Sequence, residues 1–200
     1  MAFIIGLTGK ACTGKNVVAT ALTEKNFYVI DVDKLGHQAL RENKDLIVKT
    51  FGEVLTDEGI VDRRKLGDIV FSSKTKLREL EAITHPGIKK IIINLIKEEK
   101  KGKNRDVVIN AAILERGNLL ELCDKVIYVK SNLFQRYKRT KKRDNRGFFW
   151  FLKRTIAQKD IKKPLNWSKK NLFTFNNNNG IDNIYRQVNN FYVILYKKEH

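Results

Sequence analysis

The feature that most constrains the fold is a glycine-rich turn close to the N-terminus. An apolar run at residues 3–7 is followed by the pattern G-x-x-x-x-G-K at residues 9–15 and by a helical pattern over residues 15–25. Backbone N–H groups in such a turn, with the positive end of the next helix, bind phosphate oxygens, and Lys15 adds a mobile positive charge. The pattern alone can arise by chance in any loop that contains glycine. Its place between a strand and a helix predicts a phosphate-binding loop.

The other apolar runs predict a parallel β-sheet with helices on both faces. Runs of strand length, rich in β-branched and aromatic residues, lie at residues 3–7, 28–30, 107–109, 126–129 and 172–175. They are nearly continuous rather than alternating, which is typical of strands covered on both faces. Helical patterns lie at residues 15–25, 132–160 and 180–196. We therefore predict an α/β fold.

The segment between the second and third predicted strands has helical rather than strand periodicity. Its strongest apolar stripe runs over residues 88–96, after Thr84-His85-Pro86, a sequence that suits the start of a helix. Polar residues at 100–104 end the segment. We therefore predict a helical insertion whose last helix begins near Pro86.

Composition narrows the class of protein. The 200 residues suffice for one domain of catalytic size. No apolar run reaches the roughly 20 residues of a membrane crossing, and no secretion leader is evident. Cys12 and Cys123 are too few for a disulfide framework. We therefore expect a cytoplasmic protein without a membrane partner.

The charge is strongly positive and unevenly distributed. Forty basic residues and 22 acidic residues give a net charge of +18, and residues 132–170 hold 14 basic and two acidic residues. Nucleic acid, membrane phosphate and a polyphosphorylated small molecule each fit such a segment. Lysine, asparagine and isoleucine are also abundant throughout, as a biased genome would produce, so part of this charge carries no functional information.

Two aspartates, Asp31 and Asp33, stand at the end of the second predicted strand. The carboxyl ends of parallel strands face the ligand crevice, so these side chains would lie beside bound phosphates. Asp33 is the candidate to accept the proton of an attacking hydroxyl group, and Asp31 to hold a metal-bound water. The alternative is that Asp33 caps the helix that follows, and both roles can hold together.

Four arginines in the basic segment are spaced for one face of a helix. Arg136, Arg139, Arg143 and Arg146 are three or four residues apart. Such a face favours an anion in front of it, such as a transferring phosphate beneath a closing lid. The alternative is a nucleic-acid surface on which the aromatic residues 148–151 stack with bases. An unbroken aromatic run more often packs a helix against its neighbours.

The ordered motifs resemble those of the dephospho-CoA kinase family over nearly the whole chain. The family's L-T-G-G-I-G-S-G-K-S is similar to residues 7–16, and its D-A-D to Asp31-Val32-Asp33. Its other motifs have counterparts in G-x-x-x-R-R-x-L-x-x-x-V-F at residues 59–71, His85-Pro86, R-x-x-x-R-D at 139–144 and N-N-G at 178–180. The loop motif by itself would indicate only a superfamily, whereas this ordered combination is specific.

The resemblance implies a P-loop kinase fold: a five-stranded parallel sheet flanked by helices, with a helical substrate-binding insertion and a basic helical lid. The nucleotide-binding core would comprise residues 1–33, 103–131 and 165–200, the helical domain residues 34–102 and the lid residues 132–164. The implied reaction uses ATP and Mg²⁺ to phosphorylate the ribose 3′-hydroxyl of dephospho-CoA, which gives coenzyme A in the last step of its biosynthesis.

The resemblance also implies roles for individual residues. The catalytic residues would be Asp33 as the base, Lys15, Arg139 and Arg143. ATP would be bound by Gly9, Ala11, Cys12, Thr13, Gly14, Lys15, Asn16 and Val17. The substrate would be bound by Thr8, Asp33, Arg64, His85 and Arg139, and the candidate metal ligands are Asn16 and Asp31.

Three positions depart from the family pattern. Lys10 stands where small residues are usual, and Asn110-Ala111-Ala112 where the family often has D-I-P. Asn16 stands where a serine or threonine hydroxyl normally binds Mg²⁺. An amide oxygen can coordinate a hard cation or one of its waters, so this change weakens the metal site without abolishing it.

Two other functions stay open on the sequence. One is a nucleoside or nucleotide kinase with the same fold, and the other is a protein that binds nucleotide or RNA without turning it over. Lys15, Asp33 and the two lid arginines of the motif favour chemistry. We therefore expect a small-molecule substrate and no nucleic-acid partner, and the sequence does not indicate an oligomeric state.

Overall fold

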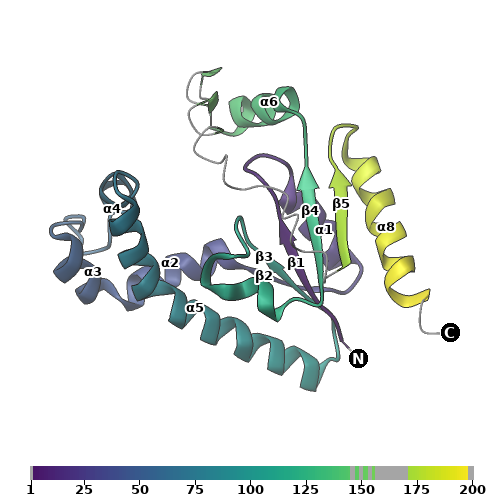
Figure 1. Ribbon diagram of the computed structural model, residues 1–200, viewed down its shortest axis with the longest axis horizontal. Helices are drawn as coiled ribbons and strands as arrows, with labels where there is room; N and C mark the ends of the chain where they lie inside the picture. The colour runs from purple at the N-terminus through teal and green to yellow at the C-terminus, as the bar shows by residue number, and fades with distance from the viewer. Residues whose placement is uncertain (1, 145–146, 149–150, 153–154, 156–170, 198–200) are drawn as a thin grey trace. The chain divides into compact units, whose positions relative to one another are not determined.

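Five parallel strands form the sheet that carries the glycine-rich turn (Figure 1). The computed structural model describes residues 2–144, 147–148, 151–152, 155 and 171–197. The strand order is β2-β3-β1-β4-β5, so the first strand lies in the middle. The strands are β1 (Ile4–Thr8), β2 (Tyr28–Asp31), β3 (Val107–Asn110), β4 (Lys125–Lys130) and β5 (Asn171–Asn176). All five predicted strands are confirmed, with each end within one residue of the prediction.

The helices lie between and after the strands in an α/β arrangement (Figure 1). They are α1 (Lys15–Glu24), α2 (Val32–Glu42), α3 (Lys44–Phe51), α4 (Arg63–Val70), α5 (Lys74–Gly102), the 3₁₀ helix η1 (Arg116–Leu122), α6 (Leu133–Asp144) and α8 (Ile181–Lys197). Internal contacts divide the chain into two units, Met1–Ile30 with Glu99–His200 and Asp31–Glu98. No helix among the described residues is long and apolar enough to cross a membrane.

In the first unit, α1 and α8 pack together against one face of the sheet. Ile5 and Leu7 point to this face because residues two apart on a strand share a side. They are buried in one cluster with Val18 and Leu22 of α1 and Phe191 of α8. This packing fixes the end of β1, from which the glycine-rich turn departs.

Gly6 brings the η1 segment close to the opposite face of the same strand. A β-carbon at Gly6 would lie 2.5 Å from Leu114 Cδ1 and 3.0 Å from Cys123 Sγ. Both residues are buried. Only glycine leaves room for this approach, so the middle strand is covered on both faces, as its continuous apolar pattern predicts.

The second unit is helical, in agreement with the predicted insertion. Its core contains Ile47 of α3 and Leu66 and Val70 of α4. Asp62 caps α4, because its carboxylate accepts hydrogen bonds from the backbone N–H groups of Arg64 (2.8 Å) and Lys65 (3.2 Å). The bond from Lys65, followed by the one from Arg64, lowers the pKa of Asp62.

The helix predicted to begin near Pro86 begins instead at Lys74, with Pro86 inside it. A proline in a helix interior removes one backbone hydrogen bond and costs about 3 kcal/mol or more. The helix continues through it because apolar side chains pack on both sides, with Leu80 before the proline and Ile88 after it. The prediction was wrong because this packing outweighs the preference of proline for a helix start.

The helix predicted over residues 132–160 is interrupted. α6 ends at Asp144, and Gly147 is not helical, which suits the low helix propensity of glycine. Asn132 precedes the helix and caps it, because its side-chain oxygen accepts a hydrogen bond from Gln135 N at 2.8 Å. Arg146 and most residues from 149 to 170 lie outside the described residues.

Candidate active site

The phosphate loop (residues 9–15) joins β1 to α1 in a conformation that its glycines permit. Gly14 has a φ of 94° and Cys12 a φ of 59°, both in the left-handed region. At Gly9 the backbone passes close to β4, where a β-carbon would lie only 2.3 Å from the carbonyl oxygen of Val129. The predicted turn is therefore present, and the two motif glycines are required by its shape.

Hydrogen bonds from two side chains of the phosphate loop to its own backbone connect distant parts of the loop. Lys15 Nζ donates a hydrogen bond to the carbonyl oxygen of Gly9 at 2.8 Å, across the two ends of the loop. Thr13 Oγ1 donates to the carbonyl oxygen of Lys10 at 2.8 Å. The first turn of α1 contains no acidic side chain, so the positive end of its dipole stays uncompensated there. This arrangement suits an anion at the start of α1.

Two arginines of α6 hold the backbone carbonyls of the phosphate loop. Arg136 is only 3% exposed, and its Nε donates to the carbonyl oxygen of Ala11 at 2.9 Å. Its guanidinium also lies over the ring of Phe151, 5.6 Å from the centroid. Arg139 Nη1 lies 3.3 Å from the carbonyl oxygen of Thr13 and 3.4 Å from that of Cys12. Both guanidiniums therefore orient the loop.

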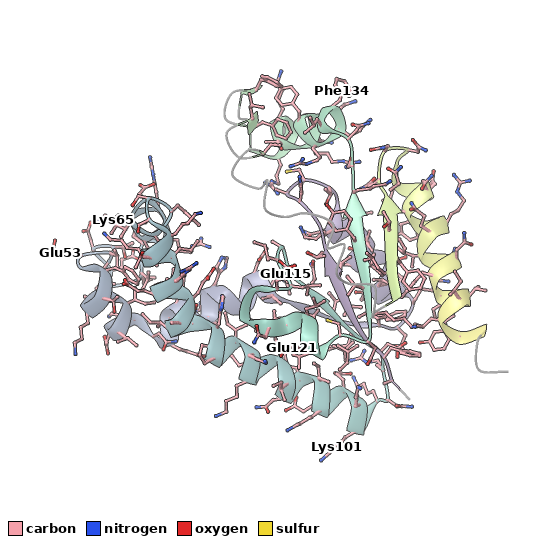
Figure 2. The ribbon with its side chains drawn as sticks, viewed as in Figure 1. Glu53, Lys65, Lys101, Glu115, Glu121 and Phe134 are labelled. Atoms are coloured by element: carbon pink, nitrogen blue, oxygen red, sulfur yellow. The ribbon has the colours of Figure 1, made fainter. Side chains whose placement is uncertain are left out.

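Of the four arginines predicted to face an anion together, the structure describes Arg136, Arg139 and Arg143, and their surroundings differ. Arg136 donates to a loop carbonyl, whereas Arg143, seven residues further along α6, has an exposed side chain. Phe134, labelled on α6 in Figure 2, is 71% exposed. Arg146 lies outside the described residues. The periodicity placed these side chains on one helix, but the position of the loop decides which of them it contacts.

Arg139 also donates hydrogen bonds to residues that follow β4 and β5. Its Nη2 donates to the carbonyl oxygen and the side-chain Oδ1 of Asn177, at 2.8 and 3.0 Å, and its Nη1 to Ser131 Oγ at 3.1 Å. Partial burial lowers the pKa of Arg139, and the nearby Cys12 opposes this shift. An arginine keeps its charge at neutral pH despite such a shift. Arg139 therefore brings a permanent cation to the phosphate loop.

Asn177 is a residue of the site that the sequence reasoning missed. Its Nδ2 donates to the carbonyl oxygen of Thr13 at 2.9 Å, and a β-carbon at Gly14 would lie 2.0 Å from that nitrogen. The neighbouring Asn178 accepts through Oδ1 from Asn132 N at 2.8 Å. A signal was available, since both asparagines follow the last strand at the edge where ligands bind in parallel sheets.

Thr8 is buried at the end of β1, where it ties two strand ends together. Its Oγ1 donates to the carbonyl oxygen of Ala112 at 2.9 Å. Ala112 belongs to the segment after β3 that departs from the family's D-I-P. The hydroxyl of Thr8 therefore positions this segment, and a role in substrate binding stays a prediction.

The two aspartates begin the second unit. Asp31 is the last residue of β2 and caps α2, because its Oδ1 accepts from the backbone N–H groups of Asp33 (3.1 Å) and Lys34 (3.4 Å). The helix cap is therefore Asp31, and the alternative that Asp33 is the cap was wrong. Asp33 lies in the first turn with an exposed side chain. The cap leaves the carboxylate of Asp33 available for another function.

Arg64 and His85, the other predicted substrate residues, also belong to the second unit. Arg64 lies in the first turn of α4 with an exposed side chain, and His85 is half-buried within α5. The structure adds a pair that the sequence did not indicate, since Arg63 Nη1 lies 2.7 Å from His37 Nε2. Arg64 and His85 keep their predicted roles as proposals.

The described half of the aromatic run packs against α6. Phe151 is buried, and its ring centroid lies 5.6 Å from that of Tyr137. Phe148 lies edge to face against the same tyrosine at 5.4 Å. Phe149 and Trp150 lie outside the described residues. Packing therefore explains Phe151, which is too buried to stack with a base.

The residues near the phosphate loop suit a metal ion that is bound by phosphate oxygens as well as by the protein. In the described part of the chain, no three His, Cys, Asp or Glu side chains gather as a metal cage. Mg²⁺ is commonly held by one or two protein ligands together with phosphate oxygens and water. Asn16 has an exposed side chain in the first turn of α1, next to Lys15. Its amide oxygen fits that mode of binding.

Comparisons with known proteins agree on one family. The sequence model described as dephospho-CoA kinase matches residues 3–183. The dephospho-CoA kinase of Fusobacterium nucleatum is 35% identical over 196 residues, covering 94% of this chain and 96% of that protein. The dephospho-CoA kinase of Shouchella clausii is 34% identical over 207 residues, covering 98% of each.

Solved structures give the same result for the fold. A dephospho-CoA kinase from Campylobacter jejuni superposes with a TM-score of 0.71 at 25% identity and covers 100% of both chains. A shikimate kinase from Acinetobacter baumannii has a TM-score of 0.55 at 15% identity, covers 100% of this chain and 96% of its own, and supports the fold alone. The chain therefore belongs to the dephospho-CoA kinase family.

Proposed function

We propose that the chain transfers the γ-phosphate of ATP to the ribose 3′-hydroxyl of dephospho-CoA and so forms coenzyme A. The observation that carries this proposal is the phosphate loop, with Lys15 across its ends and α6 arginines on its carbonyls, in a chain of this family. The 3′-oxygen attacks the γ-phosphorus, the bond to the β,γ-bridging oxygen breaks, and ADP leaves. The proton of the hydroxyl passes to the carboxylate of Asp33.

The proposed roles follow from the chemistry of each side chain. Backbone N–H groups of the phosphate loop hold the phosphates, and Lys15 neutralises charge on the β- and γ-phosphates. Arg139 and Arg143 stabilise the charge of the transferring group. Arg139 does so from a position already fixed by hydrogen bonds to Asn177, which reduces the reorganisation that the reaction requires.

The remaining predicted residues act on the acceptor and the metal. Thr8, Arg64 and His85, with Asp33 and Arg139, would contribute to the acceptor site. Asn16 and the carboxylate of Asp31 would hold Mg²⁺ or its waters. When bound, Mg²⁺ neutralises phosphate charge in the transition state. Two cysteines are too few for a disulfide framework, and a cytoplasmic location is part of the proposal.

The product assay tests the proposed function directly. Purified protein is incubated with MgATP and dephospho-CoA, and mass spectrometry follows the gain of one phosphate on the acceptor. A Lys15→Met variant is the control for a contaminating kinase. A panel of nucleosides and nucleotides separates the proposal from a nucleotide kinase with the same fold. The absence of coenzyme A at high protein concentration would refute it, and salt-sensitive RNA binding without ADP release would favour the binding protein.

Replacing Asn16 by serine is expected to increase the apparent affinity of the enzyme for Mg²⁺. A hydroxyl ligand in place of the amide would lower the Mg²⁺ concentration at half-maximal rate roughly fivefold, which corresponds to about 1 kcal/mol. The measurement is the initial rate against free Mg²⁺ at constant ATP. Thr20→Ser, at an exposed position one turn later in α1, is the matched control. An unchanged Mg²⁺ titration in the Asn16 variant would remove this residue from the metal site.

A further inference from the structure

The side chain of Asn177 is buried between the phosphate loop and Arg139, all within the first unit. Asn177 is 4% exposed, and its Nδ2 donates to the carbonyl oxygen of Thr13 at 2.9 Å. Its Oδ1 accepts from Arg139 Nη2 at 3.0 Å. A β-carbon at Gly14 would lie 2.0 Å from Nδ2, so the amide group packs directly against a glycine of the loop. Both ends of the amide are therefore engaged beside the loop.

The two partners of Asn177 restrict the chemistry of its side chain. A guanidinium only donates hydrogen bonds, and a backbone carbonyl only accepts them. The side chain between Arg139 and Thr13 must therefore accept at one end and donate at the other. An amide does both from one planar group, whereas an aspartate of the same shape would satisfy Arg139 alone. This position consequently requires asparagine rather than its isosteric acid.

The backbone of Asn177 is held in place as well. Its N–H donates to the carbonyl oxygen of Lys130, the last residue of β4, at 2.9 Å. Its carbonyl oxygen accepts from Ser131 Oγ at 2.9 Å and from Arg139 Nη2 at 2.8 Å. These bonds connect the residue after β5 to the end of β4. Asn177 therefore presents its amide to the loop from a fixed position at the edge of the sheet.

A hydrogen bond to the carbonyl of Thr13 also sets the direction of the next N–H group. The peptide bond between Thr13 and Gly14 is planar, and in its trans form the C=O and the N–H point in opposite directions. When Asn177 holds the carbonyl, the N–H of Gly14 is turned away from Asn177. Gly14 is the N-cap residue of α1. N–H groups at this point of a phosphate loop are those that bind phosphate oxygens.

We propose that Asn177 is a positioning residue of the phosphate loop: through its hydrogen bond to Thr13 it directs the N–H of Gly14 toward the phosphates of ATP. The inference rests on the part of the proposed function in which the loop binds ATP. In this role Asn177 acts through the backbone rather than on the reacting atoms. An N–H group that is already oriented binds phosphate without the cost of first turning the peptide.

The first test uses Asn177→Asp, which keeps an acceptor for Arg139 and removes the donor to Thr13. We expect KM for ATP, and the dissociation constant of a non-hydrolysable ATP analogue with Mg²⁺ measured by calorimetry, to rise roughly tenfold. KM for dephospho-CoA should change less than about threefold. Asn176→Asp is the matched control, since it adds the same charge at an exposed neighbouring position. Equal affinities for ATP in the two variants would overturn the proposal.

The second test separates the direction of the peptide from the effect of an added negative charge. NMR of the ¹⁵N-labelled full-length protein measures how far the amide proton shift of Gly14 changes between the free and the analogue-saturated state. Because a hydrogen bond to phosphate causes this change, it should be smaller in Asn177→Asp than in the wild type and in Asn176→Asp. A change equal to that of the wild type would overturn the proposal, since charge alone lowers affinity without turning the peptide.

Asn177→Ala supplies a variant without added charge. It loses both side-chain hydrogen bonds, so it should show the weaker binding of ATP and the smaller change at Gly14. Its Tm should also fall by roughly 4–8 °C. A lower Tm with the ATP affinity of the wild type would mean that Asn177 serves stability alone, which would overturn the proposal. This outcome is decisive even if Asn177→Asp does not fold.

The outcomes distinguish this proposal from the proposed function. Formation of coenzyme A with an ATP affinity that does not depend on Asn177 would reject the positioning role and leave the function intact. An affinity for the ATP analogue that depends on Asn177, in a protein that forms no coenzyme A, would reject the proposed acceptor. That result would still support the positioning role, because binding of the analogue requires no acceptor.

Discussion

Replacing Asp33 by asparagine is expected to lower kcat by about 10²–10⁴-fold while the affinity for ATP changes less than about threefold. Asparagine keeps the size of the side chain but cannot accept the proton of the 3′-hydroxyl. The cap of α2 is formed by Asp31, so this substitution removes no helix cap. The effect should therefore fall on turnover and leave folding unchanged.

The measurements are steady-state kinetics with dephospho-CoA and the binding of an ATP analogue by calorimetry. Asp45→Asn is the matched control, since Asp45 is also an exposed aspartate in the first turn of a helix, α3. We expect its kcat to match the wild type. A kcat within a factor of about three of the wild type in the Asp33 variant would remove Asp33 from the role of base. A lower melting temperature would instead point to a structural function.

The strands and the phosphate loop could be predicted because each is encoded by adjacent residues. A continuous apolar run indicates a buried strand, and Gly14 with its left-handed backbone marks the turn before a helix. The same local reasoning failed at Pro86, where packing by residues on both sides keeps α5 continuous. Local preference is a reliable guide only where no distant packing competes with it.

The network around the phosphate loop could not be predicted from local patterns. Periodicity placed Arg136 and Arg139 on one face of α6, but it did not show that this face meets the carbonyls of the loop. Asn177 lies 164 residues from Thr13 in the chain, and its side chain contacts Thr13 only because β5 ends beside the loop. Contacts of this kind depend on strand order, which the spacing of motifs does not contain.

These contacts tie Arg139, one of the two lid arginines of the family motif, to the backbone of the phosphate loop. Arg139 donates to loop carbonyls, to Ser131 and to Asn177, whereas Arg143 has an exposed side chain. A loop that binds phosphate through its N–H groups must present those groups in the right direction. By holding the opposite, carbonyl side of the peptide units, Arg139 can stabilise that direction before ATP binds.

Replacing Arg139 by alanine is therefore expected to affect both stability and catalysis. Loss of the donors to partly buried carbonyls should lower the free energy of unfolding by about 3 kcal/mol, or roughly 6–12 °C in Tm for a chain of this length. Removal of a cation from the transferring phosphate should reduce kcat by about 10²–10³-fold. Arg139→Lys should recover little of either loss, because an ammonium group cannot reproduce the forked hydrogen bonds of a guanidinium.

Arg143→Ala provides the contrast on the same helix. If Arg143 acts mainly on the transferring phosphate, its variant should lose activity while its free energy of unfolding falls by about 1 kcal/mol or less, well below the loss at Arg139, as is usual for an exposed charged residue. Thermal unfolding measures the stability of the Arg139→Ala and Arg143→Ala variants, and steady-state kinetics measures their activity. Equal melting temperatures for the two variants would contradict a structural role for Arg139. Full activity in the Arg139 variant would show that neither its charge nor its hold on the loop is needed for phosphate transfer.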